Sequence, residues 1–251
     1  MRRWRGPWLG FAPTGIAEVA ELLVVAAEPR ELRGILRRCR GAKRLGWPLW
    51  FARAGDLNAN RLVMVANGPG QELAAKAVGT ALARSHPDAV ISTGYCGALD
   101  SALAAGEIFV AVRVEAAGAG FAAAVPAAAG RGWKTGTLLS LERVATTVAE
   151  KSRLRESGAA AVDMEAGAVA LAAQRAGLPF YCIRAVLDRA EEEFGFDFNA
   201  LRGAAGRFSR SRILKAALAR PLERLPELMK IERRGRKASR ALGDFIAQCV
   251  F

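Results

Sequence analysis

The chain has 251 residues, of which 52% are hydrophobic, enough to bury the core of one large α/β domain or two small ones. Four scattered cysteines without CxxC spacing argue against a disulfide framework or a metal site and favour the cytoplasm, and the lack of an apolar run of about 18 residues argues against a membrane-spanning helix. The net charge of +13 is concentrated in residues 201–240, which hold 13 lysines and arginines against three glutamates, so the sequence predicts a local basic surface and no general nucleic-acid-binding surface.

Residues 1–20 form an N-terminal extension without hydrophobic periodicity, and their twin arginine is not followed by the apolar core of an export signal. Residues 22–27, LLVVAA, predict a buried first strand. This strand runs into Glu28-Pro29-Arg30-Glu31, a composition that is favourable in the first turn of a helix. From these residues alone, Glu31 is either a helix-start acid or a carboxylate at the sheet edge that activates water.

Residues 49–53 and 61–66 predict two further strands, and the turn Asn67-Gly68-Pro69-Gly70 leads into an alanine-rich helix over 71–85. Glycines at a strand-to-helix turn free backbone N–H groups for an anion or a sugar, although glycine turns are common. The only histidine, His86, follows this helix and is far in the pattern from the candidate acids, so no Ser-His-Asp triad is expected.

Residues 89–94 predict the next strand, which is followed by Tyr95, Cys96 and Gly97. Gly94 and Gly97 allow the backbone to approach a ligand closely. Cys96 has no histidine partner, and apolar surroundings should raise its pKa, so we interpret it as part of a pocket wall.

A low-complexity segment and a further strand come next in the chain. Residues 118–130 are almost entirely alanine and glycine and predict a loop or sheet edge with little fixed structure. Residues 133–141 predict a return to a strand.

Residues 159–189 predict strand, helix and strand, with acids at the joints. Asp163-Met164-Glu165 precedes an alanine-rich helix, and the apolar run 180–186 ends just before Asp188. Ligands lie outside the carboxyl ends of strands in open α/β sheets, so Glu165 and Asp188 are placed to face one crevice. The alternative is a helix-start acid and a loop acid without chemical function.

The C-terminal quarter begins with the acidic and aromatic segment 189–199. It is either a solvated loop or a lid in which Phe194, Phe196 or Phe198 closes over a bound base. Residues 200–250 predict two helices, and the second, after Pro221, combines one apolar face with basic residues elsewhere. Such a helix packs on the domain or lies on an anionic membrane surface. The apolar positions are Leu222, Leu225, Leu228 and Ile231.

Three blocks in the chain resemble motifs of the purine nucleoside phosphorylase and methylthioadenosine nucleosidase superfamily. They are VDMEAGAVALAAQRAGLPFYCIRAVLD at 162–188, DAVISTGYCGALDSALAAGEIFVAV at 88–112 and the weaker NGPG at 67–70. The resemblance covers most of residues 22–220. It implies a three-layer α/β/α sandwich with a mixed twisted sheet over 21–220, after the extension 1–20 and before a basic amphipathic C-terminal helix over 221–251.

The resemblance also implies a reaction, cleavage of the N-glycosidic bond of an adenosine-type nucleoside, without a metal or a cofactor. Asp188 would be the general acid toward the purine, Glu31 would activate water, and Glu165 would hold the ribose hydroxyls above Met164. We expect Asp188 to be buried, since two carboxyl groups with different tasks need different pKa values. The remaining candidates belong to the base pocket and are Gly94, Tyr95, Cys96, Gly97, Val144 and Asp163.

Two other functions stay open. In the phosphorylases of the superfamily an arginine of the first turn holds phosphate, and phosphate would then be a co-substrate held by Arg30, Gly68 and Gly70. Glu31 stands where that arginine is expected, and this favours water over phosphate as the acceptor of the reaction. The other function is a non-catalytic protein that binds a nucleoside or a membrane surface.

The C-terminal stretch ALARPLERLPELMKIERRGRKASRAL is similar to the end of the hopanoid-associated nucleoside phosphorylases. This resemblance implies an adenosyl lipid such as adenosylhopane as substrate, with peripheral membrane contact through residues 201–240. Members of the superfamily are dimers or larger, so a homo-oligomer, with a dimer favoured, is expected.

Overall fold

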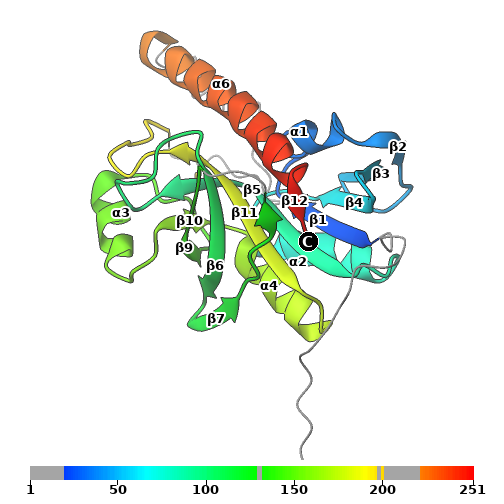
Figure 1. Ribbon diagram of the computed structural model, residues 1–251. Coiled ribbons are helices and arrows are strands. Elements are labelled where there is room, and N and C mark those ends of the chain that lie inside the picture. Colours follow the sequence, from blue (N-terminus) through cyan, green and yellow to red (C-terminus); the bar gives the residue numbers. More distant parts are fainter. Residues whose placement is uncertain (1–19, 129–131, 197–198, 201–220) are drawn as a thin grey trace, which may run out of the picture.

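The computed structural model describes residues 20–128, 132–196, 199–200 and 221–251 (Figure 1). The predicted N-terminal extension, Phe198 and the first of the two predicted C-terminal helices lie outside these residues. The second predicted C-terminal helix is α6 (Pro221–Ile246).

A mixed ten-stranded sheet forms the centre of the molecule, in the order β10-β9-β6-β11-β5-β1-β4-β3-β2, with β7 beside β6. Its strands are β1 (Glu21–Ala26), β2 (Arg40–Arg44), β3 (Phe51–Leu57), β4 (Asn60–Ala66), β5 (Ala89–Ala98), β6 (Ile108–Ala116), β7 (Ala119–Ala122), β9 (Trp133–Ser140), β10 (Ala161–Asp163) and β11 (Phe180–Asp188). A second sheet pairs β8 (Ala127–Ala128) with β12 (Cys249–Val250).

The apolar runs of the sequence form the middle of this sheet. β1 pairs in parallel with β4 and β5, and β11 pairs in parallel with β5. Continuous apolar strands of this kind are stable where helices cover both faces of a sheet. The parallel arrangement brings the carboxyl ends of β1, β5 and β11 to one edge.

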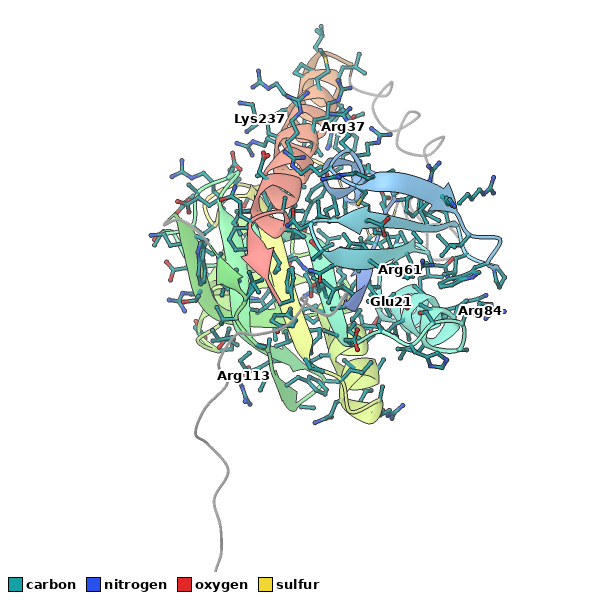
Figure 2. The ribbon with its side chains drawn as sticks, turned by 45° about the vertical axis from the view of Figure 1, so that its right-hand side comes forward. Glu21, Arg37, Arg61, Arg84, Arg113 and Lys237 are labelled. Carbon is teal, nitrogen blue, oxygen red and sulfur yellow. The ribbon has the colours of Figure 1, made fainter. Side chains whose placement is uncertain are left out.

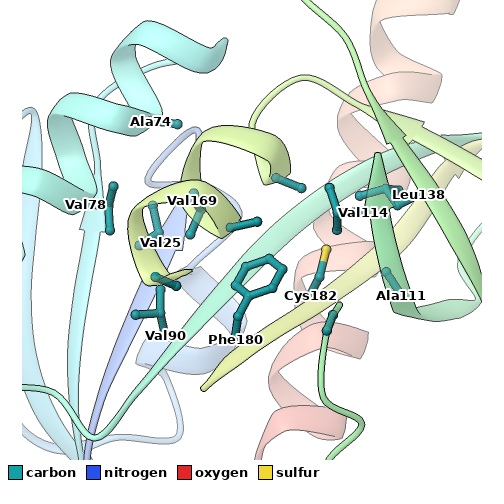
Figure 3. Packing of buried hydrophobic residues seen from close by; sticks show 14 of the residues in the cluster. Val25, Ala74, Val78, Val90, Ala111, Val114, Leu138, Val169, Phe180 and Cys182 are labelled. Atoms are coloured by element: carbon teal, nitrogen blue, oxygen red, sulfur yellow. The ribbon is translucent and has the colours of Figure 1, made fainter. Parts of the chain in front are cut away.

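Helices cover both faces, which confirms the predicted three-layer sandwich. The helices α2 (Gln71–Leu82) and α4 (Ala166–Arg175) pack on one face, where Val78 and Val169 meet Val25 and Phe180 of the sheet (Figure 3). The opposite face is covered by α1 (Arg33–Leu36) and α6 (Figure 1). A further helix, α3 (Val148–Arg155), lies beside β9 and β10 (Figure 1).

The helix α6 is part of the sandwich and also extends beyond it. Its C-terminal half buries Leu242 and Ile246 against the sheet, whereas its N-terminal end projects past the body of the protein (Figure 1). The predicted single apolar face is wrong, because Leu222 is 92% exposed while Ile231 lines a cavity. Three residues of an α-helix turn about 300°, which is about 60° short of a full turn. Residues that are always three apart, as the four predicted apolar positions are, therefore lie on different sides of the helix.

Three local predictions also differ from the structure. The helix expected from Pro29 begins only at Arg33, because residues 28–31 form a turn in which the Glu31 side chain accepts the Glu28 N–H. β5 continues through Gly97 to Ala98, and its end bends to pair with β10 as well as β11. The described part of the segment 118–130, which is 118–128, is more regular than expected, since β7 pairs with β6 and β8 with β12.

Candidate active site

A cavity of about 990 Å³ lies at the carboxyl ends of β1, β5 and β11, under the N-terminal half of α6. This is the sheet edge where ligands are expected in open α/β folds. The three predicted acids, Glu31, Glu165 and Asp188, all line it. Other lining residues that the sequence had singled out are Arg30, Tyr95, Cys96, Gly97, Val144, Met164 and Phe194.

Glu31 is held in the turn after β1 and is only 6% exposed. Its Oε2 accepts the Glu28 N–H at 2.8 Å, and its Oε1 accepts the Tyr95 N–H at 3.2 Å. Burial raises the pKa of Glu31 to about 7, although the Glu28 hydrogen bond acts in the opposite direction. Gly94 permits this arrangement, because it adopts φ +137° and a Cβ there would lie 3.0 Å from Glu31 Oε1.

Glu165 stands immediately before α4, and its carboxylate reaches across to the turn after β4. Its Oε1 accepts the Gly70 N–H at 2.8 Å. Removal from water and the nearby charges of Asp163 and Glu31 raise the pKa of Glu165 above its ordinary value. A carboxyl group with such a pKa accepts hydrogen bonds from hydroxyl groups when it is ionised and donates one when it is protonated.

Asp188 ends β11 and is buried, as expected, with 6% exposure. Its Oδ2 accepts a hydrogen bond from Lys151 Nζ at 2.5 Å. Burial raises the pKa of Asp188 to about 6, while the positive charge of Lys151 lowers it. The backbone of Gly97 lies close, since a Cβ at that position would be 3.2 Å from Asp188 Oδ2. Asp188 therefore has the character of an acid near neutral pH.

Asp163 does not line the cavity, in contrast to its predicted place in the pocket wall. Its Oδ2 pairs with Arg184 Nη2 at 2.6 Å and accepts the Ala166 N–H at the start of α4 at 2.9 Å. Because Asp163 is the last residue of β10, its side chain lies beneath the site and fixes the beginning of α4. Gly94 is likewise absent from the lining and contacts Glu31 instead.

The candidate phosphate ligands already have partners within the protein. Gly70 N–H donates to Glu165, and Gly68 N–H donates to the Ala27 carbonyl at 2.9 Å. Arg30 lines the cavity and forms an ion pair with Glu28. Neither glycine lines the cavity. Burial raises the pKa of the Cys96 thiol well above its ordinary value, so Cys96 is an uncharged wall residue.

Several residues at or beneath the site were not found from the sequence. Arg184 is buried under it and also donates to Ser92 Oγ at 2.7 Å; a charged residue inside the apolar run of β11 was the available signal. Lys151 gave no signal, because it is one of several charged residues in the short helix α3. The cavity wall from α6 consists of Leu228, Ile231 and Glu232, and Trp50 completes it from the start of β3.

The fold and the carboxyl-lined cavity at the sheet edge are those of an α/β enzyme. The model of the Phosphorylase superfamily matches residues 21–128 and 124–219, so the chain belongs to this superfamily.

Nucleosidases are found among the relatives. The chain is 27% identical over 174 residues to a 5′-methylthioadenosine/S-adenosylhomocysteine nucleosidase of Staphylococcus saprophyticus, covering 58% of this chain and 76% of that protein. It is similar in structure to the nucleosidase of the same name from S. pneumoniae, with a TM-score of 0.68, 18% identity and coverage of 91% and 99% of the two chains. The enzyme from Colwellia psychrerythraea, in complex with adenine, gives a TM-score of 0.64 at 22% identity and covers 73% and 88%. These two structures establish the fold.

Proposed function

We propose that this protein hydrolyses the N-glycosidic bond of an adenosine-type nucleoside and releases adenine. The observation that supports this function is the convergence of three carboxyl groups, Glu31, Glu165 and Asp188, on one cavity, each held by a different set of partners. The curated relative in Staphylococcus saprophyticus is a nucleosidase for 5′-methylthioadenosine and S-adenosylhomocysteine, which agrees with this chemistry.

Each carboxyl group has a separate task in this mechanism. Breaking the bond leaves positive charge on the ribose and negative charge on the purine, and Asp188 neutralises the purine by donating a proton to its N7. Water adds to the ribose C1′ while Glu31 accepts its proton. Glu165 holds the 2′ and 3′ hydroxyls, and Met164 packs beneath the sugar. One water is consumed, and the products are adenine and the free sugar.

Water is favoured over phosphate as the acceptor because of the charge and partners around Glu31. A carboxylate at this place repels a phosphate dianion, and the amides of Gly68 and Gly70 have partners inside the protein. Arg30 and Arg33 line the cavity near this turn, and Arg30 is paired with Glu28. Phosphorolysis through Arg30, Gly68 and Gly70 is the second candidate reaction.

We further propose an apolar 5′ substituent, as in an adenosyl lipid such as adenosylhopane. Three large apolar residues of the cavity wall, Trp50, Leu228 and Ile231, support this substrate. A cavity of about 990 Å³ also lies at the upper end of the range for small-molecule sites.

Peripheral contact with a membrane belongs to the same proposal. On the outward side of α6, Leu222, Leu225 and Met229 are exposed, and Arg233 and Arg236 follow them toward the C-terminus. Lys237 of α6 and Arg37 of α1 lie at the same end of the molecule (Figure 2). Exposed apolar and basic side chains together favour an anionic bilayer surface. None of the helices in the described part of the chain is long and apolar enough to cross a membrane.

The test is the release of free adenine from adenosine, methylthioadenosine and an adenosyl lipid. We expect release by the wild-type protein and a loss of roughly 100-fold or more in Asp188→Asn and in Glu31→Gln. Tight binding of the nucleosides without turnover, unchanged in Asp188→Asn, would instead indicate a non-catalytic binding protein.

A further inference from the structure

Lys151 is a buried cation that the proposed reaction does not use. It is the only buried residue of α3, with a side chain that is 1% exposed. Its Nζ lies 2.5 Å from Asp188 Oδ2 and 2.8 Å from each of the carbonyl oxygens of Arg189 and Glu192. An ammonium group has three N–H donors, so these three acceptors satisfy it completely.

The geometry of Lys151 fixes one side of the Asp188 carboxyl group. A buried ammonium is costly unless it is paired, and Asp188 is the carboxylate that pairs with it. Within the described part of the chain, no residue donates a hydrogen bond to the other oxygen, Oδ1. Because Asp188 lines the cavity, Oδ1 is the oxygen available to a bound base.

We propose that Lys151 is a positioning residue for Asp188, which directs Oδ1 at the purine and stabilises the carboxylate that remains after the proton has been donated. This inference rests on the proposed function, because it takes Asp188 to be the acid of the reaction. The positive charge of Lys151 makes Asp188 a stronger acid than a buried carboxyl group would otherwise be.

The charges that face Asp188 come from three elements. Lys151 of α3 and Arg234 of α6 lower the pKa of Asp188, whereas its burial and the carboxylate of Glu192 in the following loop raise it. When the Lys151 charge is removed, Arg234 still lowers the pKa of Asp188, against the effects of burial and of Glu192. Asp188 would then hold its proton more tightly and transfer it less readily to the purine.

The same lysine connects the acid to the segment after β11, which contributes Phe194 to the cavity wall. It holds the carbonyls of Arg189 and Glu192, and the Glu192 carboxylate accepts hydrogen bonds from Arg234 at 2.6 and 2.8 Å and from Lys230 at 3.0 Å. Phe194 of this segment lies over the ammonium, with 5.5 Å from Nζ to the ring centroid. Lys151 thus connects Asp188 to the loop that lies under α6.

The kinetic test compares Lys151→Met with the wild-type protein and with Lys76→Met, a control at an exposed lysine of α2. We expect Lys151→Met to lower kcat roughly 10- to 100-fold with KM within about threefold, and to move the alkaline limb of the pH profile upward. In an Asp188→Asn background, Lys151→Met should cause no further loss beyond about twofold. Equal losses in both backgrounds, or an unmoved alkaline limb, would overturn the inference.

A second measurement does not depend on activity. A carboxyl resonance of Asp188, assigned by its absence from Asp188→Asn, should titrate at higher pH in Lys151→Met and at an unchanged pH in Lys76→Met. If Lys151→Met does not fold, Lys151→Arg replaces it, because arginine keeps the positive charge. In this variant Asp188 should titrate at the wild-type pH although kcat is lower. Titration of Asp188 at a higher pH in Lys151→Arg would contradict the positioning role of Lys151. Wild-type protein without adenine release would overturn the proposed function, and the titration would still decide whether Lys151 controls Asp188.

Discussion

At the scale of single residues, the site depends on carboxyl groups that are kept from water to different degrees. Glu31 accepts two backbone N–H groups, Glu165 accepts one, and Asp188 pairs with a lysine. In all three, burial is the largest cause of a raised pKa. Three similar side chains thereby acquire different chemistry from their surroundings.

The pH dependence of kcat/KM follows from two of these groups. Glu31, with a pKa of about 7, acts when it is ionised, and Asp188, with a pKa of about 6, acts when it is protonated, so activity declines below about pH 6 and above about pH 7. Because the base has the higher pKa, we expect a bell-shaped profile with a maximum at about pH 6.5. Initial rates of adenine release between pH 4.5 and 9 in buffers of constant ionic strength measure it. A plateau that extends to pH 9 would contradict the assignment of Asp188 as the acid.

The pH dependence of protein stability should also report the raised pKa of Glu31. The pKa of Glu31 is raised from 4.5 to about 7 by folding, so the native state binds its proton more tightly than the unfolded chain does. The contribution of protonated Glu31 to the stability of the fold is therefore present below pH 4.5 and is lost as the pH rises through 7. This loss lowers the free energy of unfolding by roughly 2–3 kcal/mol. Urea unfolding at pH 5 and pH 8 should show a smaller difference between the two pH values for Glu31→Gln than for the wild-type protein. An equal difference would show that Glu31 is ionised without penalty.

At the scale of elements, the site lies at the ends of the strands, and Gly97 of β5 allows the close approach of β10 and β11. Gly97 lies between Asp188 of β11 and Val162 of β10, and an added Cβ would be 3.2 Å from Asp188 Oδ2 and 3.4 Å from Val162 Cγ1. The close approach of β5 to both neighbours thus depends on the missing side chain.

A methyl group at this position should displace the acid more than it disturbs the fold. For Gly97→Ala we expect kcat to fall roughly 10-fold or more, since a misplaced catalytic group loses rate steeply, with a loss of stability of about 1 kcal/mol. The matched control is Gly79→Ala in α2, where nothing lies within 4 Å of the new Cβ. This control should gain about 0.5–1 kcal/mol of stability, because alanine is the better helix former, and should keep its rate. Equal kcat values in the two variants would show that Gly97 does not restrain Asp188.

The acids at strand ends were predictable from sequence, whereas their supports were not. Glu165 and Asp188 follow apolar runs and belong to blocks with a family resemblance, so their neighbourhood could be expected. Lys151 comes from a polar helix, and only tertiary packing decides which of its charged residues is buried. Asp163 was misplaced for a similar reason, because its partner Arg184 lies on a different strand. The sequence did not predict that α6 forms a wall of the cavity. Its apolar residues are three apart, and this spacing does not define which side of the helix faces the protein.

At the scale of the whole molecule, α6 joins the site to the outer surface. One side of the helix contributes Ile231 to the cavity, and the other presents exposed Leu222 and Met229 ahead of its arginines. The projection of this end beyond the sheet leaves it accessible (Figure 1).

A vesicle assay tests the proposed membrane contact. We expect sedimentation with vesicles that contain anionic phospholipid, weak sedimentation with neutral vesicles, and a decrease with salt because charges are screened. The double variant Leu222→Ser, Met229→Ser should bind anionic vesicles roughly fivefold more weakly, since two apolar groups no longer enter the interface, and should cleave adenosine at the wild-type rate. Equal binding of neutral and anionic vesicles would contradict a role for the basic residues, and binding of neither would contradict the proposed membrane contact.

The central claim is that water, activated by Glu31, is the acceptor in the cleavage of an adenine nucleoside. The most direct measurement is to incubate the protein with methylthioadenosine in phosphate buffer and to follow both products, adenine by its absorbance and any sugar phosphate by phosphorus NMR. The account predicts one free sugar for each adenine, no sugar 1-phosphate and the same rate when phosphate is omitted. A sugar 1-phosphate formed in step with adenine, and no reaction without phosphate, would contradict it.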